Sequence, residues 1–217
     1  MQKHEIEITK TARYFTLGEL NENTKTVWFV LHGYAQTAED FLESLKPLQQ
    51  ENTFIIAPEG LSRFYWRDFS NNPVASWMTK TDREVDIDDN MKYLSKLYKS
   101  LFSKVNLSNI KVNYLGFSQG AATLSRWLFQ ENLKVNNVFF YAGNIATDLN
   151  YASSKQYLNA NLYFIYGDND FFIKQKDADA LLFFFKKNKL KLNIFTFEGK
   201  HVIAETALNY ISKQQNN

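Results

Sequence analysis

A serine flanked by glycines stands in the middle of this chain, at a corner between a predicted strand and a predicted helix. The run Gly116-Phe117-Ser118-Gln119-Gly120 follows residues typical of a buried strand and precedes a helical pattern over 121–130. A sharp strand-to-helix turn strains the serine backbone, and glycines two residues away on each side avoid collisions there. The pattern predicts a corner that presents the Ser118 hydroxyl above a sheet as a candidate nucleophile, rather than an ordinary turn serine.

A serine nucleophile needs a base, and one of the three histidines stands in a suitable place. In this architecture the chain order is serine, acid, histidine. His4 and His32 precede Ser118, whereas His201 follows it, in a loop after the predicted strand 191–197. A lone loop histidine is often only solvated, but a base must come within hydrogen-bond reach of the serine. His201 is therefore the candidate base.

Two aspartates compete for the role of the acid that orients this base. The predicted strand 162–166 ends in Gly167-Asp168-Asn169-Asp170, at the carboxyl edge of the expected sheet. Either carboxylate could hold the imidazole in one tautomer and stabilise the imidazolium. The other aspartate would then form a turn, a common role for that residue. Spacing leaves both Asp168 and Asp170 as candidates.

Backbone N–H donors must stabilise the negative charge that develops on a substrate carbonyl. One predicted donor is the amide of Gln119, at the positive end of the helix that Ser118 opens. The second is expected in the loop after strand 27–31, where His32-Gly33-Tyr34 places a glycine beside a backbone that must approach the substrate. We interpret His32 as a side chain that braces this loop, not as a proton carrier.

Short motifs of one known family occur along nearly the whole chain: Leu31-His32-Gly33, Ala57-Pro58-Glu59-Gly60, Trp77 before an acidic helix start, Gly116-Phe117-Ser118-Gln119-Gly120, Gly167-Asp168-Asn169-Asp170 and Gly199-Lys200-His201. Together they resemble the phospholipase/carboxylesterase family of α/β-hydrolases, which includes the acyl-protein thioesterases. The resemblance implies the α/β-hydrolase fold and an esterase-type activity. It also implies that Asp170, the second aspartate of its group, is the catalytic acid and that the amide of Tyr34 is the second oxyanion donor.

The chain departs from the family pattern beside the expected site. Ala121 replaces a usual glycine, Phe171 replaces a usual proline after the acid, and Lys200 replaces a usual glycine before the histidine. We name Trp77, Phe171 and Phe172 as candidate substrate-contacting residues. With the aromatic segment 64–77, these rings are expected to restrict the site to short or medium acyl chains, unless they anchor loops in the core instead.

Apolar runs alternate with amphipathic helical patterns along the chain, which predicts a mostly parallel sheet with helices on both faces and no large cap domain. Antiparallel edge pairing is expected up to about residue 17, including an edge strand over 1–8, whereas 60–77 shows little periodicity. The predicted strands are 27–31, 53–57, 110–115, 137–141, 162–166 and 191–197. The predicted helices are 38–50, 86–103, 119–131, 174–188 and 202–211.

Composition narrows the class of protein. The 25 basic and 23 acidic residues give a net charge of +2, which offers no argument for a nucleic-acid partner. The absence of cysteine excludes disulfides and thiolate catalysis and suits a reducing compartment. No run resembles a signal peptide or approaches the roughly 20 apolar residues that span a bilayer. We therefore expect a cytoplasmic protein without integral membrane segments.

The length of 217 residues fits one α/β domain over 1–217, with 212–217 as a polar tail. The acidic run 84–90 lacks the central glycine and closing glutamate of a calcium loop. The sequence carries neither a paired-histidine metal motif nor a glycine-rich phosphate loop. We expect no metal, no organic cofactor, and a small ester or acyl compound as the substrate.

These residues together predict a serine hydrolase that cleaves carboxylic esters, with thioesters or lysolipids as related substrates, through an acyl-Ser118 intermediate. One alternative is a catalytically silent binding protein, because a fold does not guarantee its activity. Intact Ser118, Asp170 and His201 argue against that alternative. Another is an acyltransferase that uses an acceptor other than water, which the sequence does not distinguish from a hydrolase.

Overall fold

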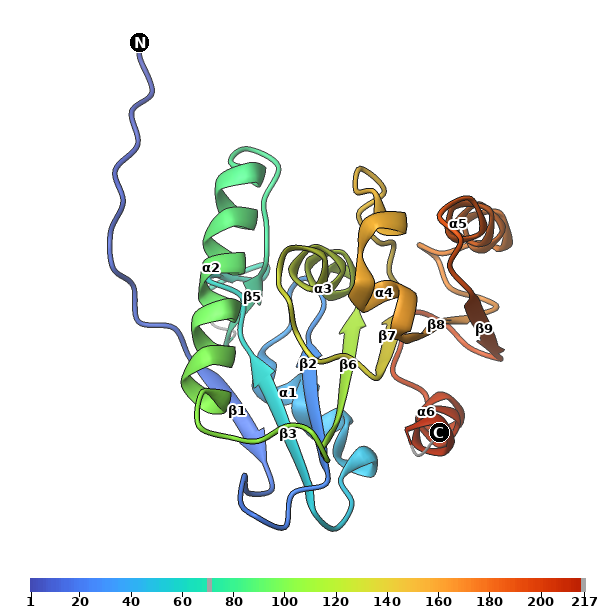
Figure 1. Ribbon diagram of the computed structural model, residues 1–217. Coiled ribbons are helices and arrows are strands. Elements are labelled where there is room, and N and C mark those ends of the chain that lie inside the picture. The colour runs from blue at the N-terminus through green and yellow to red at the C-terminus, as the bar shows by residue number, and fades with distance from the viewer. Residues whose placement is uncertain (70–71, 216–217) are drawn as a thin grey trace.

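A seven-stranded sheet forms the centre of the computed structural model, which describes residues 1–69 and 72–215 (Figure 1). The strand order is β1-β3-β2-β6-β7-β8-β9, and β1 pairs antiparallel with β3 while the other neighbours pair in parallel. The strands are β1 (Tyr14–Leu17), β2 (Thr26–Leu31), β3 (Thr53–Pro58), β6 (Lys111–Phe117), β7 (Asn137–Tyr141), β8 (Asn161–Gly167) and β9 (Leu192–Phe197). The loops that follow the six parallel strands therefore meet at one edge of the sheet.

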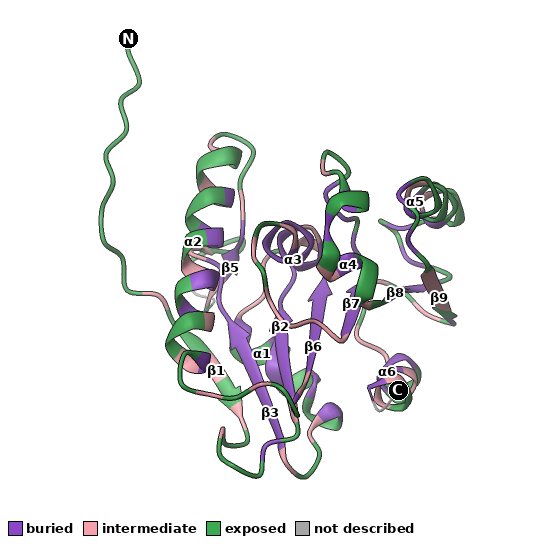
Figure 2. Cartoon of the chain, in the orientation of Figure 1, coloured by how far each residue is buried: buried purple, intermediate pink, exposed green. Residues whose placement is uncertain are grey.

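Helices cover both faces of the sheet, because buried side chains of each strand point alternately to the two sides. In β2, Val27 and Phe29 belong to one core cluster and Trp28 and Val30 to the other. The central strands β2, β3 and β6 are almost entirely buried (Figure 2). The first cluster includes α2 (Arg83–Phe102), α3 (Gln119–Gln130), α4 (Lys155–Asn159) and α5 (Gln175–Lys187). The second includes α1 (Ala38–Ser44) and α6 (Glu205–Gln214). The predicted mostly parallel sheet with helices on both faces is confirmed.

The N-terminal segment differs from its prediction as an edge strand. Residues 1–13 form no strand, and residues 1–11 are exposed, with the segment extending away from the sheet (Figure 1). Ile6 and Ile8 are 88% and 81% exposed, so their alternation with polar residues faces no sheet. Edge pairing begins only at Tyr14, which lies opposite Pro58 in β3.

The helix predicted over 38–50 is shorter. α1 ends at Ser44, and a single 3₁₀ turn, η1 (Lys46–Leu48), follows it. Pro47 accounts for the break, because proline has no N–H and its ring collides with the carbonyl one turn before it. A second 3₁₀ turn, η2 (Tyr151–Ser153), precedes α4.

The segment 60–77, predicted without regular structure, contains an antiparallel hairpin formed by β4 (Ser62–Tyr65) and β5 (Pro73–Ser76). The register pairs Ser62 with Ser76 and Tyr65 with Pro73. An isolated bridge joins Ala75 of this hairpin to Gln36, in the loop after β2. The hairpin therefore lies beside the loop that was expected to carry an oxyanion donor.

The predicted polar tail is largely part of the fold. Helix α6 continues to Gln214, and Gln215 is only 1% exposed. Its side-chain oxygen accepts a hydrogen bond from Trp28 Nε1 at 3.2 Å, which explains why a polar residue is buried there. Residues 216 and 217 lie outside the described residues. Within the described ranges, no helix has the length and apolar character needed to cross a bilayer.

Candidate active site

Ser118 occupies the corner between β6 and α3 in a strained backbone conformation. Its φ of 52° and ψ of −117° fall outside the regions that non-glycine residues prefer, at a cost of roughly 1–3 kcal/mol. A side chain at Gly116 would place its Cβ 2.6 Å from the Gly120 carbonyl oxygen, and one at Gly120 would come 2.3 Å from the Leu31 carbonyl oxygen. The two glycines therefore permit the tight turn that leaves Ser118 partly exposed.

His201 and Asp170 form a close pair beside this corner. His201 Nδ1 lies 2.7 Å from Asp170 Oδ2, and the Asp170 side chain is completely buried. The other carboxylate oxygen, Oδ1, accepts hydrogen bonds from the amides of Phe172 at 2.7 Å and Ile173 at 3.1 Å. These bonds fix the carboxylate, so His201 donates from Nδ1 and keeps Nε2 for other chemistry.

Asp168, the other aspartate of the loop, has a different environment. It is exposed, and its Oδ1 accepts hydrogen bonds from the Gly199 amide at 3.0 Å and from Asn169 Nδ2 at 3.1 Å. Asp168 therefore joins the loop after β8 to the loop after β9. The structure brings Asp170 to His201 and places Asp168 in the turn.

The His201 ring packs between two aromatic residues. Its centroid lies 5.0 Å from that of Phe117, the residue before Ser118, and 4.9 Å from that of Phe172. The Phe117 contact brings the imidazole next to the corner. No hydrogen bond joins Ser118 to His201 in the described part of the chain. In unliganded active sites such bonds are often long and tighten only when substrate binds.

Two backbone amides near Ser118 are free to donate. In the loop after β2, the amide of Gly33 donates to Gln36 Oε1 at 2.7 Å, and that of Ala35 donates to the Ala75 carbonyl at 3.0 Å. The amide of Tyr34, between them, has no partner among the described residues. The amide of Gln119, the first residue of α3, likewise has none within the ranges that the structure describes. Both are the donors that the sequence proposed for an oxyanion.

The Gln119 side chain makes contacts that the sequence did not predict. Its Oε1 accepts hydrogen bonds from the Trp77 amide at 2.9 Å and from Ser76 Oγ at 3.2 Å. Its Nε2 donates to the Met78 carbonyl at 2.9 Å. The start of α3 is thereby fixed to the end of the β4–β5 hairpin. Only the position of Gln119 next to the serine could have suggested such a role.

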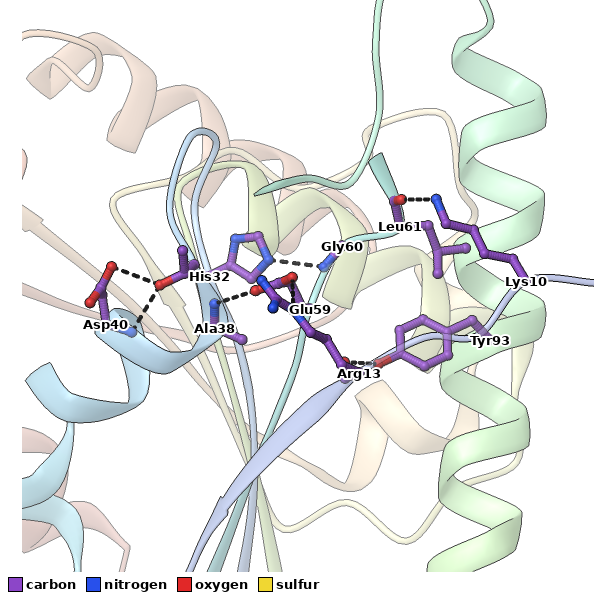
Figure 3. Close-up of polar contacts among 10 residues, drawn as sticks. Lys10, Arg13, His32, Ala38, Asp40, Glu59, Gly60, Leu61 and Tyr93 are labelled. Atoms are coloured by element: carbon purple, nitrogen blue, oxygen red, sulfur yellow. Dashed lines mark hydrogen bonds and ion pairs between the residues drawn. The ribbon is translucent and has the colours of Figure 1, made fainter. Parts of the chain in front are cut away.

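His32 braces the loop after β2, as the sequence indicated. The ring is fully buried and accepts a hydrogen bond at Nε2 from the Gly60 amide at 3.0 Å (Figure 3). Its Nδ1 lies 2.7 Å from the Gly33 carbonyl oxygen. Because Nε2 accepts, the neutral ring carries its proton on Nδ1. Burial lowers the pKa of His32 to about 4, so the ring is neutral at pH 7.

The prediction that Trp77 contacts substrate is wrong for this structure. Its side chain is completely buried, its Nε1 donates to the His32 carbonyl at 2.8 Å, and its ring stacks on that of His32 at 4.9 Å. Phe171 and Phe172, by contrast, are 79% and 67% exposed. Of these three candidates, only the two phenylalanines lie on the surface beside the pair His201–Asp170.

Another group of exposed or partly exposed rings lies beside the loop that carries the Tyr34 amide. The Tyr34 ring, 48% exposed, lies 5.3 Å from Phe64 and 5.6 Å from Trp66, measured between centroids. We call Tyr34, Phe64 and Trp66 the aromatic shelf. It joins the β4–β5 hairpin to the loop that carries the Tyr34 amide. No cluster of three or more His, Cys, Asp or Glu side chains suited to a metal ion occurs within residues 1–69 and 72–215.

The chain is similar to known proteins in its sequence family and in its fold. Residues 22–210 match the model of a family described as Serine hydrolase (FSH1). Acyl-protein thioesterase 2 of Zea mays is 16% identical, with a TM-score of 0.74 over 95% of this chain and 98% of that one. A carboxylesterase from Mesorhizobium loti is 14% identical, with a TM-score of 0.74 over 95% of each chain. No curated protein matches the sequence. These structural likenesses confirm the predicted α/β-hydrolase fold.

Proposed function

The chain belongs to the serine hydrolase (FSH1) family, and we propose that it hydrolyses carboxylic esters, with thioesters and lysolipids as related substrates, through an acyl-Ser118 intermediate. The observation that carries this proposal is the 2.7 Å contact of His201 with buried Asp170, next to the strained Ser118 corner. A histidine held by a buried carboxylate, beside a partly exposed serine on such a corner, is the arrangement that acyl transfer requires.

In the proposed mechanism, Ser118 Oγ attacks the ester carbonyl carbon while its proton passes to His201 Nε2. The carbonyl oxygen gains the negative charge and accepts hydrogen bonds from the Tyr34 and Gln119 amides. When the tetrahedral intermediate collapses, the bond to the leaving alcohol or thiol breaks, and that group takes the proton from Nε2. Water then gives a proton to Nε2 and attacks the acyl carbon, which forms a second tetrahedral intermediate. When this intermediate collapses, the bond from the acyl carbon to Ser118 Oγ breaks, Oγ takes the proton back from Nε2, and the acid leaves. Asp170 stabilises the imidazolium in both halves.

The substrate in this proposal is a small ester whose apolar part contacts exposed rings. Phe172 packs against His201 on one side, and the aromatic shelf is built on Tyr34, whose amide is a proposed oxyanion donor. These rings support a site for short or medium acyl groups, because bulky side chains beside the nucleophile leave little room for a long chain. The cytoplasm is the compartment that we assign to the reaction, since a chain without cysteine suits a reducing environment.

A fluorophosphonate probe tests the proposal directly, because it phosphonylates only a serine that is activated in this way. We expect one labelled peptide, which contains Ser118, and turnover of esters in a panel that also contains thioesters and lysolipids. Labelling at another serine, or a complete lack of labelling and turnover, would contradict the proposal. The relative rates across the panel identify the leaving group.

A further inference from the structure

Glu59 is a buried carboxylate that lies outside the proposed catalytic set of Ser118, His201 and Asp170. It lies close to residues 32–37, the loop between β2 and α1 that carries the Tyr34 amide and that we call the oxyanion loop. Glu59, the first residue after β3, is 2% exposed. Its Oε1 accepts a hydrogen bond from Arg13 Nε at 2.5 Å, and its Oε2 accepts one from the Ala38 amide at 3.2 Å (Figure 3). Removing a carboxylate from water costs several kcal/mol unless a cation and hydrogen bonds compensate. The position of Glu59 therefore calls for a structural or functional reason.

Glu59 and the next residue hold the two ends of one loop. The Gly60 amide donates to His32 Nε2 at 3.0 Å, where the loop leaves β2. The Glu59 carboxylate accepts from the Ala38 amide, where the loop enters α1. Tyr34 lies between these two anchors. The amides of Gly33 and Ala35, on either side of it, already donate hydrogen bonds within the protein, whereas the Tyr34 amide has no partner among the described residues. The residues that follow β3 thus anchor both ends of the loop that carries the Tyr34 amide.

Arg13 supplies the positive charge that Glu59 needs. Its backbone carbonyl accepts hydrogen bonds from the Glu59 amide at 3.1 Å and from Tyr93 Oη at 2.8 Å, so β3 and α2 both hold the residue in place. Glu39 lies near Arg13, and His32, which is neutral at pH 7, lies near Glu59. Lys10 and Arg63 line the same hollow as Arg13 and Glu59, but Arg13 is the cation that bonds to the Glu59 carboxylate among the described residues.

We propose that Glu59 and Arg13 are positioning residues, which act through the Ala38 amide to hold the Tyr34 N–H in line with the oxyanion. The proposal rests on the proposed function, because it assigns the Tyr34 amide to the transition state. An interaction that forms only in the transition state changes kcat rather than KM. A displaced donor should therefore slow the chemical step and leave substrate binding nearly unchanged.

The test compares Glu59→Gln, Arg13→Gln and Arg13→Lys with Glu39→Gln as the matched control. Glu39 is an exposed acid near Arg13 that accepts no hydrogen bond from the loop in the described residues. Each variant is measured for kcat and KM on a nitrophenyl ester and for inhibition by a trifluoromethyl ketone, whose serine adduct carries an oxyanion. Circular-dichroism melts identify a temperature at which all variants are folded.

Loss of a whole oxyanion donor costs about 10²–10³ in kcat, so a displaced donor should cost roughly 10- to 100-fold. We expect this loss in kcat for Glu59→Gln and Arg13→Gln, with KM within about twofold of wild type. The inhibition constant of the trifluoromethyl ketone should rise by the same factor as kcat falls. Arg13→Lys should recover much of the rate because it keeps the charge, and Glu39→Gln should match wild type. If Glu59→Gln does not fold, the two Arg13 variants still decide the question.

Unchanged kcat and ketone inhibition in the folded variants, with a lower melting temperature alone, would overturn the positioning role. An equal effect of Glu39→Gln would overturn it too, because general electrostatics would then explain the loss. Failure of the proposed function is distinguishable from both results. In that case the wild-type protein itself would not be labelled by the fluorophosphonate probe and would hydrolyse no ester.

Discussion

His201 Nδ1 lies 2.7 Å from Asp170 Oδ2, and the same carboxylate accepts two backbone hydrogen bonds through its other oxygen. Those two bonds come from the amides of Phe172 and Ile173, in the turn that leads to α5. Because the turn holds the carboxylate, Asp170 can hold the imidazole without moving. The orientation of the proposed base is therefore determined by the backbone after β8.

We predict that Asp170→Asn lowers kcat by up to roughly 10⁴, because the amide permits the wrong imidazole tautomer. The variant keeps an oxygen that can accept from Phe172 and Ile173, so the turn should survive. Asp168→Asn is the matched control, since Asp168 contacts Gly199 and not His201. Steady-state kinetics on a nitrophenyl ester compares the two, and a larger loss in the Asp168 variant would show that the acid is misassigned.

Ser118→Ala should abolish fluorophosphonate labelling and ester turnover while the thermal melt stays close to that of wild type. His201→Ala should reduce kcat by a comparable factor, on the order of 10⁴ or more, because residues of a triad act as a unit. Intact-mass spectrometry after incubation with the probe measures the first effect. Residual adduct in the Ser118 variant would assign the nucleophile to another residue.

Phe172→Ala should shift the preferred acyl length towards longer chains. Each methylene that an apolar pocket accepts contributes roughly 0.8 kcal/mol, so kcat/KM should rise over the first carbons and then fall where the pocket closes. A series of nitrophenyl esters from acetate to palmitate measures this optimum. Phe171→Ala should shift it less, because Phe171 contacts Phe172 rather than His201.

Both phenylalanines are mostly exposed, so neither substitution should destabilise the fold in the way that loss of a core phenylalanine does. Thermal melts of the two variants check this point. A wild-type optimum at long chains, or an unchanged optimum in Phe172→Ala, would show that these rings do not limit the acyl group.

His32 should make stability depend on pH in the acidic range. Burial lowers the pKa of the folded imidazole to about 4 from an ordinary value of 6.5, so the unfolded chain takes up this proton first as the pH falls. Neutral His32 therefore makes its full contribution to the free energy of unfolding above pH 6.5. This contribution falls by roughly 3 kcal/mol as the pH is lowered from 6.5 to 4.

The His32→Gln variant lacks this titration and serves as the reference. It should be less stable than wild type at pH 7, and the difference between the two should shrink as the pH approaches 4. Urea unfolding at several pH values measures the difference. Two parallel stability curves would mean that the proton does not distinguish folded from unfolded His32.

The sheet and the Ser118 corner were predictable because both depend on local patterns. Apolar runs gave the parallel strands, and the glycines around Ser118 indicated a turn that few other residues allow. The ranking of Asp168 and Asp170 was not predictable from spacing, since both stand in one turn and only the loop after β9 decides which one meets His201. The family resemblance favoured Asp170, and the geometry places that residue at His201.

The errors arose where tertiary contacts override local pattern. Trp77 follows a loop that suits a substrate wall, but its indole N–H finds the His32 carbonyl and the ring is buried. The sequence of the β4–β5 hairpin shows no clear apolar–polar alternation, and the hairpin forms a separate two-stranded sheet whose neighbouring rings Phe64 and Trp66 pack on Tyr34. Ile6 and Ile8 show the reverse case, with strand-like alternation but no sheet edge beside them.

The β-bridge between Gln36 and Ala75 joins the β4–β5 hairpin to the loop that carries the Tyr34 amide. The Gln119 side chain joins the end of the same hairpin to the start of α3. We therefore expect a ligand that tilts the hairpin to shift the two amides proposed for the oxyanion as well. A well-fitting ester would align both donors, whereas a poorly fitting one would bind and still react slowly. Discrimination between substrates would then be expressed in the rate of acylation, and two esters with equal affinity would differ in turnover.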